Sequence, residues 1–271
     1  MTVLKDKVAL ITGSTRGIGR VAALKLAALG ARVVVTGRTV DPGGKLPGSL
    51  SEVEAQIRAA GGEVCAIAAD LADPADIRRL AEEVIARFGG CDILVNNAAY
   101  MGRHSAHPLE KIEPEGWNHV FAVNVTAPVL LAQALVPSMR ARGGGRIVNV
   151  TSGAGDFTRG DNKTPGLAYP ASKAALDLAS HRLMRDLRPD NIAVILMCPG
   201  FTASESVMAA LGAWARDDDS LHRASAAHST DVPASVIAHF CSCPDPWIHV
   251  GPRHQAAPTY ERLGLGAPVQ A

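Results

Sequence analysis

Several features that would point to particular classes of protein are scarce in this sequence. The net charge is only +1 over 271 residues, so nothing favours nucleic acid or a membrane surface as a partner. No unbroken apolar run reaches the roughly 18 residues that a membrane span needs. Met1–Lys7 is charged and contains no apolar signal-peptide core. We therefore expect a cytoplasmic protein that binds neither nucleic acid nor a membrane.

Cysteine is also sparse, and its pattern favours neither disulfides nor metal. Five cysteines are an odd count, which argues against a disulfide framework in a chain without secretory features. Three lie in or beside apolar strand-like runs, where a thiol behaves as a small hydrophobic group: Cys65, Cys91 and Cys198. The pair Cys241 and Cys243 lacks a second pair or a matching histidine spacing. Exposed or hydrogen-bonded side chains are the commoner state of histidines such as His249 and His254, so we expect no metal site.

Apolar runs rich in β-branched residues alternate with helical patterns along the chain. The expected strands are Val8–Thr12, Arg32–Thr36, Glu63–Ala68, Ile93–Asn96, Arg146–Val150 and Ile192–Met197. The expected helices are Gly17–Leu29, Ser51–Ala60, Pro74–Phe88, Glu113–Arg142 with an interruption at Pro128, and Tyr169–Leu187. Near-continuous apolar strands separated by helices indicate parallel pairing with both faces covered. We expect a single α/β domain over residues 1–271, a doubly wound sheet of six to seven parallel strands with helices on both faces.

Three long segments interrupt this alternation. Asp41–Ser49 is rich in proline and glycine, and Gly153–Leu167 is polar. Phe201–Thr230 contains the acidic run Asp217–Asp219, which we interpret as a solvated turn. Substrate sites are usually built from loops at the carboxyl ends of parallel strands, so we expect a substrate-side flap at about 201–230, with a helix near Ser204–Arg216. One face of that helix is apolar and either lines a substrate pocket or packs on the core: Met208, Leu211 and Trp214.

A glycine-rich turn joins the first expected strand to the first helix. It reads Thr12-Gly-Ser-Thr-Arg-Gly-Ile-Gly19. Glycines let the backbone turn sharply and approach a pyrophosphate closely, and the helix N-terminus offers free N–H groups and a favourable dipole. In this strand–turn–helix context the pattern predicts a dinucleotide site in a Rossmann fold.

The end of the second strand decides which dinucleotide binds. A carboxylate there would bond the adenosine ribose and repel a 2′-phosphate. This chain instead has Thr36-Gly37-Arg38-Thr39. Arg38 can clamp a phosphate through two hydrogen bonds, and Arg16 can approach it from the glycine turn. We therefore predict NADP(H) as cofactor in preference to NAD(H).

Together with further motifs, these residues make the chain resemble the short-chain dehydrogenase/reductase family from Lys7 to about Pro246. Besides the glycine turn, the motifs in chain order are Asp70-Leu71, Asn96-Asn97-Ala98-Ala99, Asn124, Ser152, Tyr169-x-x-x-Lys173 and Pro199-Gly200. The segment Arg38–Leu50 further resembles the hydroxysteroid-dehydrogenase-like-2 branch. The resemblance implies hydride transfer between NAD(P)(H) and a carbonyl or secondary alcohol carbon. We expect an NADPH-dependent reductase of a small ketone or aldehyde.

The resemblance also implies which residues hold the cofactor. Asp70 would accept a hydrogen bond from the adenine amine, and the Leu71 backbone would contact the ring. Thr202 would bond the nicotinamide carboxamide or a phosphate. The full expected set is Gly13, Ser14, Thr15, Arg16, Gly17, Ile18, Gly19, Arg38, Thr39, Asp70, Leu71, Asn97, Ala98, Ala99, Tyr169, Lys173, Pro199, Gly200 and Thr202.

The expected acid and base is Tyr169, four residues before Lys173 and therefore on the same face of a helix. A phenol with a pKa of ~10 is a poor base at neutral pH, and a neighbouring ammonium lowers that pKa by favouring the phenolate. Lys173 would also hold the nicotinamide ribose. Ser152 ends the fifth strand and can hydrogen-bond the substrate oxygen. The resemblance implies that Asn124 fixes a water beside Lys173, which completes the expected catalytic set.

Two segments depart from the family's pattern. Tyr169 follows Ser152 by 17 positions, a longer spacing than the family's usual one. The loop between them would shape the substrate pocket, and we interpret three of its charged side chains as solvated: Arg159, Asp161 and Lys163. Near the C-terminus, where the family has a last strand, Pro252 interrupts the run Ile248–Gln255. In the family this region supports assembly, and we expect a homodimer or homotetramer.

Two other functions are compatible with the sequence. An enoyl-type reductase would share the fold, but the intact set of Ser152, Tyr169 and Lys173 favours carbonyl chemistry. A non-catalytic dinucleotide-binding regulatory protein would predict the loss of Tyr169 or Lys173, and both are present.

Overall fold

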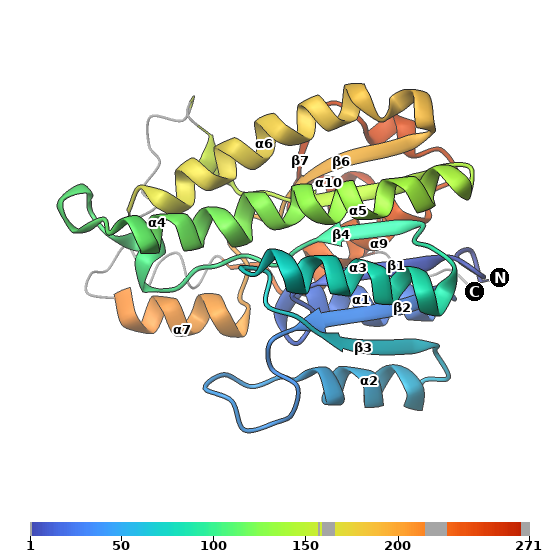
Figure 1. The fold of residues 1–271 in the computed structure, drawn as a ribbon, viewed down its shortest axis with the longest axis horizontal. Coiled ribbons are helices and arrows are strands. Elements are labelled where there is room, and N and C mark those ends of the chain that lie inside the picture. Colours follow the sequence, from blue (N-terminus) through green and yellow to red (C-terminus); the bar gives the residue numbers. More distant parts are fainter. Residues whose placement is uncertain (1, 157, 159–165, 215–226, 267–271) are drawn as a thin grey trace.

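The sheet confirms the expected doubly wound α/β fold. The computed structural model describes residues 2–156, 158, 166–214 and 227–266, and of residues 210–214 only the backbone. Seven parallel strands are hydrogen-bonded in the order β3-β2-β1-β4-β5-β6-β7 (Figure 1). They are β1 (Val8–Thr12), β2 (Arg32–Gly37), β3 (Val64–Ala68), β4 (Ile93–Asn96), β5 (Gly145–Val150), β6 (Ile192–Cys198) and β7 (Arg253–Gln255). Every residue of β1 and β6 is buried, as expected for strands covered on both faces.

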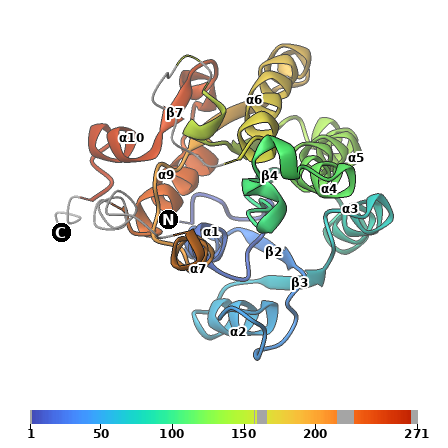
Figure 2. The same ribbon diagram turned by 90° about the vertical axis from the view of Figure 1, so that its left-hand side faces the viewer.

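Helices cover both faces of the sheet, and each face has its own apolar core (Figure 2). One face is covered by α1 (Gly17–Ala28), α2 (Leu50–Ala59), α9 (Asp231–Ser242) and α10 (Ala256–Arg262). The other is covered by α3 (Pro74–Phe88), α4 (Pro114–Phe121), α5 (Ala127–Ala141) and α6 (Ala168–Asp186). Apart from one interruption, the elements expected up to β6 match the observed ones to within one residue at each end.

Helix α3 shows why the local signals were sufficient there. Asp73 precedes the helix, and its carboxylate accepts a hydrogen bond from the N–H of Ala75 at 2.8 Å. Pro74 occupies the first turn, where its missing N–H costs nothing. Gly89 ends the helix with a φ of +71°, a left-handed conformation that glycine adopts without strain.

The interruption in the long helix lies before the expected position at Pro128. Residues Ala122–Thr126 form a π turn between α4 and α5. Pro128 has no N–H to donate to the carbonyl of Asn124, four residues earlier, so the regular α-helical ladder fails at that carbonyl. The whole span Pro114–Ala141 is apolar and long enough to cross a membrane by composition alone, but half of its most apolar window is buried. Core packing of α5 therefore accounts for the same signal.

The chain after β6 is the part that the sequence did not delineate. The helix expected near Ser204–Arg216 is α7 (Glu205–Trp214), and α9, which packs on α1, was not expected at all. The last strand, β7, is only three residues long and starts directly after Pro252, parallel to the end of β6. Other expectations fall outside the described parts: those for Asp217–Asp219, Arg159, Asp161 and Lys163, and for the side chains of Leu211 and Trp214.

Candidate active site

The glycine turn after β1 is closed by side chains from the neighbouring strand. A side chain at Gly19 would collide with the carbonyl oxygen of Gly13, so this close approach requires glycine. The Nδ2 atom of Asn97 donates to the carbonyls of Thr12 at 2.9 Å and Gly13 at 3.2 Å. In return, Oγ1 of Thr12 accepts the N–H groups of Asn97 and Ala98, both at 3.0 Å. Asn97 thus braces the turn, and Thr12 is a supporting residue that sequence reasoning did not single out.

Ser14, expected among the cofactor residues, uses its hydroxyl for the backbone. Its Oγ donates to the carbonyl of Ile11 at 2.9 Å and accepts the N–H of Thr36 at 2.8 Å. The side chain is fully buried between the ends of β1 and β2. Ser14 therefore fixes the position of the turn relative to the second strand.

The residues expected around a 2′-phosphate meet at one corner, beyond β2. Nη2 of Arg16 donates to Oγ1 of Thr39 at 3.3 Å and to the carbonyl of Gly48 at 3.1 Å. The guanidinium of Arg38 is 64% exposed, and its Nη1 lies 4.0 Å from a carboxylate oxygen of Asp70. Among the described residues, Nε of Arg16 is buried without a hydrogen-bond partner. Arg16 therefore keeps an unused donor beside Thr39, and the side chain of the neighbouring Arg38 is open to solvent.

The N-terminus of α1 already holds an anion from within the chain. The N–H of Gly17 donates to Oε2 of Glu205 at 2.9 Å. Glu205 begins α7, the helix of the expected flap, so this contact joins the flap to the glycine turn. A carboxylate at this helix end is favourable because the free N–H groups and the helix dipole attract negative charge.

The other expected cofactor residues lie at the carboxyl ends of the strands. Leu71 is buried, Ala98 is partly buried and Ala99 is exposed. Pro199 and Gly200 follow β6, and Oγ1 of Thr202 donates to the carbonyl of Pro199 at 3.2 Å.

Ser152, Tyr169 and Lys173 come together between β5 and α6. The hydroxyl of Ser152 hydrogen-bonds the phenol of Tyr169. Lys173 is 2% exposed, its Nζ donates to the carbonyl of Val150 at 2.9 Å, and it lies 5.8 Å from the centroid of the Tyr169 ring. Burial raises the pKa of Tyr169 to about 12, although the bond with Ser152 opposes the rise. Burial also lowers the pKa of Lys173 to about 8.

The direction of the Tyr169 shift corrects the expectation that Lys173 lowers this pKa. The reason is geometric, because the ammonium is bonded to the Val150 carbonyl and not to the phenol oxygen. Desolvation therefore dominates, and the phenol stays protonated at neutral pH.

Asn124 lies in the π turn and connects it to α6. Its side chain is fully buried, with Oδ1 accepting the N–H of Tyr100 at 2.7 Å and Nδ2 donating to Oγ of Ser172 at 3.0 Å. Ser172 in turn donates to the carbonyl of Tyr169 at 2.7 Å. Asn124 and Ser172 thus fix the first turn of the helix that carries Tyr169 and Lys173. Ser172 lies within the Tyr-x-x-x-Lys motif, but its spacing gave no signal of this role.

Sequence reasoning also missed Arg253, in β7. Its Nη2 lies 2.6 Å from a carboxylate oxygen of Asp156, in the loop after Ser152, and its Nη1 lies 2.8 Å from Asp177 in α6. All three side chains are about one-fifth exposed or less. Arg253 therefore joins the last strand to the two segments that carry Ser152 and Tyr169.

This arrangement has counterparts in known proteins. A family model for the short chain dehydrogenases matches residues 7–213. A 3-oxoacyl-[acyl-carrier-protein] reductase from Synechocystis is 34% identical over 206 residues, covering 76% of this chain and 78% of the relative. A 3alpha-hydroxysteroid dehydrogenase from Mediterraneibacter gnavus is 33% identical over 207 residues, covering 76% of this chain and 78% of that protein.

Solved structures extend the likeness over nearly the whole chain. L-sorbose reductase from Gluconobacter frateurii, complexed with NADPH and L-sorbose, is 30% identical with a TM-score of 0.81, covering 94% of this chain and 97% of that one. A metagenomic short-chain oxidoreductase in complex with NADP is 34% identical with a TM-score of 0.75, covering 94% and 99%. The chain therefore belongs to the short-chain dehydrogenase family. It is an NAD(P)-dependent oxidoreductase that acts on alcohol or carbonyl groups.

Proposed function

We propose that this chain is an NADPH-dependent reductase of small ketones or aldehydes, with Tyr169 as the proton donor. The observation that carries the proposal is the convergence of three side chains: the phenol of Tyr169 is hydrogen-bonded to Ser152, and Lys173 lies beside the Tyr169 ring. We further propose a single cytoplasmic domain that assembles as a homodimer or homotetramer and whose flap, at about 201–230, borders the substrate.

The residues present fit a phosphorylated dinucleotide. The glycine turn brings bare backbone to the N-terminus of α1, where the N–H of Gly17 already donates to an anionic group, the carboxylate of Glu205. The unpartnered Nε of Arg16 and the exposed guanidinium of Arg38 favour a 2′-phosphate at the corner beyond β2. Asp70 stands beside Arg38 and is suited to an adenine amine.

Proton transfer is the task of the chain's own side chains. When bound, the reduced nicotinamide supplies a hydride to the carbonyl carbon. Ser152 and Tyr169 both offer a hydroxyl to the substrate oxygen, and Tyr169 gives up its proton as negative charge develops there. With its pKa raised to about 12, the phenol is fully protonated at neutral pH and ready for this step. The same steps run in reverse for alcohol oxidation.

Lys173 and Asn124 support this step from behind Tyr169. A pKa of about 8 leaves Lys173 mostly charged at neutral pH, and the ammonium is suited to the nicotinamide ribose and to stabilising the phenolate that remains. The carbonyl of Asn124 has lost its usual α-helical donor at Pro128, which suits it to hold a water for returning a proton.

The cofactor assignment is tested by titrating the protein with NADPH and with NADH and following nicotinamide fluorescence. Arg38→Ala should weaken NADPH binding by roughly 10-fold or more, the size of one charged hydrogen bond, and leave NADH binding unchanged. Arg20→Ala is the matched control, because Arg20 lies on α1 and bonds Gln56 away from the corner. Equal affinities for both cofactors in the unaltered protein would refute the NADPH preference.

The substrate class is tested with a panel of acyl, sugar, steroid and simple ketones and aldehydes in the presence of NADPH. Reduction of at least one ketone or aldehyde, lost in Tyr169→Phe, is the expected result. Binding of NADPH without turnover of any carbonyl would instead favour the non-catalytic alternative.

A further inference from the structure

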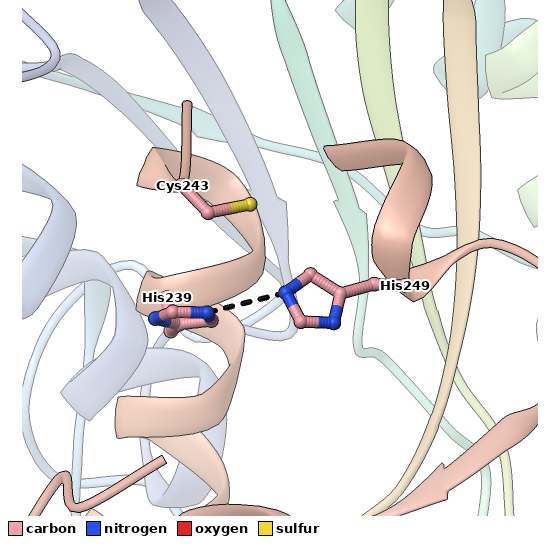
Figure 3. Close-up of side chains that lie close together, drawn as sticks. All are labelled: His239, Cys243 and His249. Atoms are coloured by element: carbon pink, nitrogen blue, oxygen red, sulfur yellow. Dashed lines mark hydrogen bonds between the residues drawn. The ribbon is translucent and has the colours of Figure 1, made fainter. Parts of the chain in front are cut away.

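Two histidines and a cysteine converge at the C-terminal end of α9, away from the candidate active site. His239 lies in the last turn of α9 and Cys243 directly follows the helix, while His249 faces them from a short 3₁₀ turn, Pro246–His249 (Figure 3). One ligand atom from each side chain lies within 4.8 Å of the other two. The Nε2 atoms of the two histidines are 3.2 Å apart.

The sequence spacing hid this cluster. His239 and Cys243 are four residues apart, so a helix places them on one face, and the chain then turns back to bring His249 opposite them. Cys243 is 6% exposed and His249 3% exposed, while His239 is partly exposed. The pairs weighed from the sequence, Cys241 with Cys243 and His249 with His254, each supply one member.

We propose that His239, Cys243 and His249 form a zinc site that has no part in the reductase chemistry. Thiolate and imidazole are the ligands that zinc prefers, at about 2.3 Å and 2.0–2.1 Å. Tetrahedral geometry at these bond lengths separates ligand atoms by roughly 3.3–3.8 Å. The two imidazole nitrogens are already close to that spacing at 3.2 Å, and the sulfur needs to approach by at most about 1 Å.

The surroundings supply the other requirements of such a site. Nη1 of Arg146 lies 3.8 Å from Sγ of Cys243 and places a positive charge beside the sulfur that would bind the metal. The same guanidinium donates to the carbonyls of Phe240 at 3.0 Å and Cys243 at 2.6 Å, which fixes the end of α9. Because His239 is partly exposed, water can occupy the fourth coordination position.

A zinc ion at this location would help to fix the position of the last strand, β7. Arg146 lies near the amino end of β5, whereas Ser152 follows its carboxyl end, so a strand of roughly 20 Å separates the cluster from the candidate active site. Four residues after His249 the chain enters β7, whose Arg253 bonds Asp156 and Asp177. Zinc would therefore stabilise the connection between α9 and β7 and, through it, the strand that borders the active site.

The test uses the full chain without a polyhistidine tag, stripped of metal by a chelator. Zn²⁺ is titrated in competition with a chromophoric chelator, and Co²⁺ is titrated while the absorption spectrum is recorded. We expect one Zn²⁺ per chain, the visible bands of tetrahedral Co²⁺, a near-ultraviolet thiolate-to-cobalt band, and a higher thermal unfolding midpoint with Zn²⁺.

Two variants and a matched control decide the assignment. Cys243→Ala should abolish the thiolate-to-cobalt band and weaken Zn²⁺ binding at least about 100-fold, beyond what outer-shell changes cost. His239→Gln, at a partly exposed position that tolerates the change, should keep the thiolate band and weaken Zn²⁺ binding to a similar extent. Cys241→Ala removes a buried thiol two residues away and should match the unaltered protein.

Three results would overturn the proposal. The first is the absence of stoichiometric Zn²⁺ binding, which would leave a simple hydrogen bond between His239 and His249. The second is unchanged Zn²⁺ affinity in Cys243→Ala or His239→Gln. The third is loss of the cobalt thiolate band in Cys241→Ala as well. If Cys243→Ala does not fold, the affinity of His239→Gln decides the question.

Discussion

Two regions of the molecule, the chain up to Lys173 and the segment after β6, differ in how far their contacts could be predicted. In the first region, three motif side chains bond backbone groups: Ser14, Asn97 and Lys173. In the second region, the contacts that the sequence did not indicate join one side chain to another, as between Arg253 and Asp156 or between His239 and His249. Backbone groups are present whatever the sequence, so a motif that bonds them can be recognised one residue at a time. A contact between two side chains can be predicted only when the two residues are known to be neighbours in space.

The largest effect is expected in the first region, at Tyr169. Tyr169→Phe removes the proton donor without changing the shape of the ring, so kcat for carbonyl reduction should fall by about 10²–10⁴-fold. NADPH affinity and the thermal midpoint should stay close to those of the unaltered protein. Tyr260→Phe, in α10, is the control. If Tyr169→Phe kept more than a tenth of the activity, the proton would have to come from another group.

The second largest effect is expected at Arg253, in the second region. Arg253→Met leaves two carboxylates, Asp156 and Asp177, without the guanidinium that bonds both of them. Breaking a buried pair typically costs 3–5 kcal/mol, and because these side chains are partly exposed we expect a loss of about 2–3 kcal/mol in the free energy of unfolding. Urea denaturation at pH 7 measures it.

A comparison within the same network sharpens this result. Asp156→Asn leaves Arg253 bonded to Asp177 and should cost only about 1 kcal/mol. A loss below 1 kcal/mol for Arg253→Met would mean that contacts between side chains contribute little to the second region, and the contrast between the two regions would fail.

The same contrast explains how much of the fold could be read from the sequence. Through β6, apolar runs alternating with helical patterns predicted the elements to within one residue at each end, apart from the interruption in the long helix. After β6, the strand β7 is three residues long and pairs only with the end of β6, so no local periodicity announces it. The interruption of the long helix was expected at Pro128 but lies before it. Pro128 cannot donate to the carbonyl four residues earlier, so the helical hydrogen bonding fails there.

The candidate site divides in the same way. The sequence indicated the residues that converge around Tyr169, and it placed Arg16 and Thr39, which are hydrogen-bonded, in one expected set. It did not indicate Arg253, because the partners of Arg253 lie 76 and 97 positions away. It also gave the wrong direction for the pKa of Tyr169, since the hydrogen bond from Lys173 to Val150 depends on three-dimensional geometry.

Protonation of Lys173 gives the third effect, on the pH dependence of stability. Burial lowers the pKa of Lys173 from its ordinary 10.5 to about 8, so between these values the folded chain binds fewer protons than the unfolded chain. The contribution of Lys173 to the free energy of unfolding should therefore rise with pH, by about 2 kcal/mol from pH 8 to pH 10. Burial raises the pKa values of Cys91, Cys241 and Tyr169 to about 12, and these groups act in the opposite direction, the thiols already near pH 9, so the contribution of Lys173 has to be measured separately.

Lys173→Met isolates this contribution, because methionine fills similar space without a titrating group. The difference in unfolding free energy between Lys173→Met and the unaltered protein should shrink by about 2 kcal/mol as the pH rises from 8 to 10. Parallel pH profiles for the two proteins would show that Lys173 is not desolvated in solution. The contact of Lys173 with the Val150 carbonyl would then not keep this charge away from water, contrary to what the structure of the first region suggests.

The smallest effect is expected where the two regions meet, at Glu205. Its carboxylate holds the N–H of Gly17, which lies at the helix end where a pyrophosphate is expected. An anionic cofactor must displace it, so Glu205→Gln, which weakens the competing contact, should tighten NADPH binding by about 5-fold, or roughly 1 kcal/mol. Glu261→Gln, at an exposed position in α10, controls for the change in net charge.

Whether Glu205→Gln tightens or weakens NADPH binding distinguishes two roles for the proposed flap. Tighter binding in Glu205→Gln means that the second region competes with the cofactor for the glycine turn, and that the flap must leave Gly17 before the cofactor binds. Weaker binding would mean that Glu205 helps to hold the cofactor-bound state instead. In that case this contact between the regions would act with the motif and not against it.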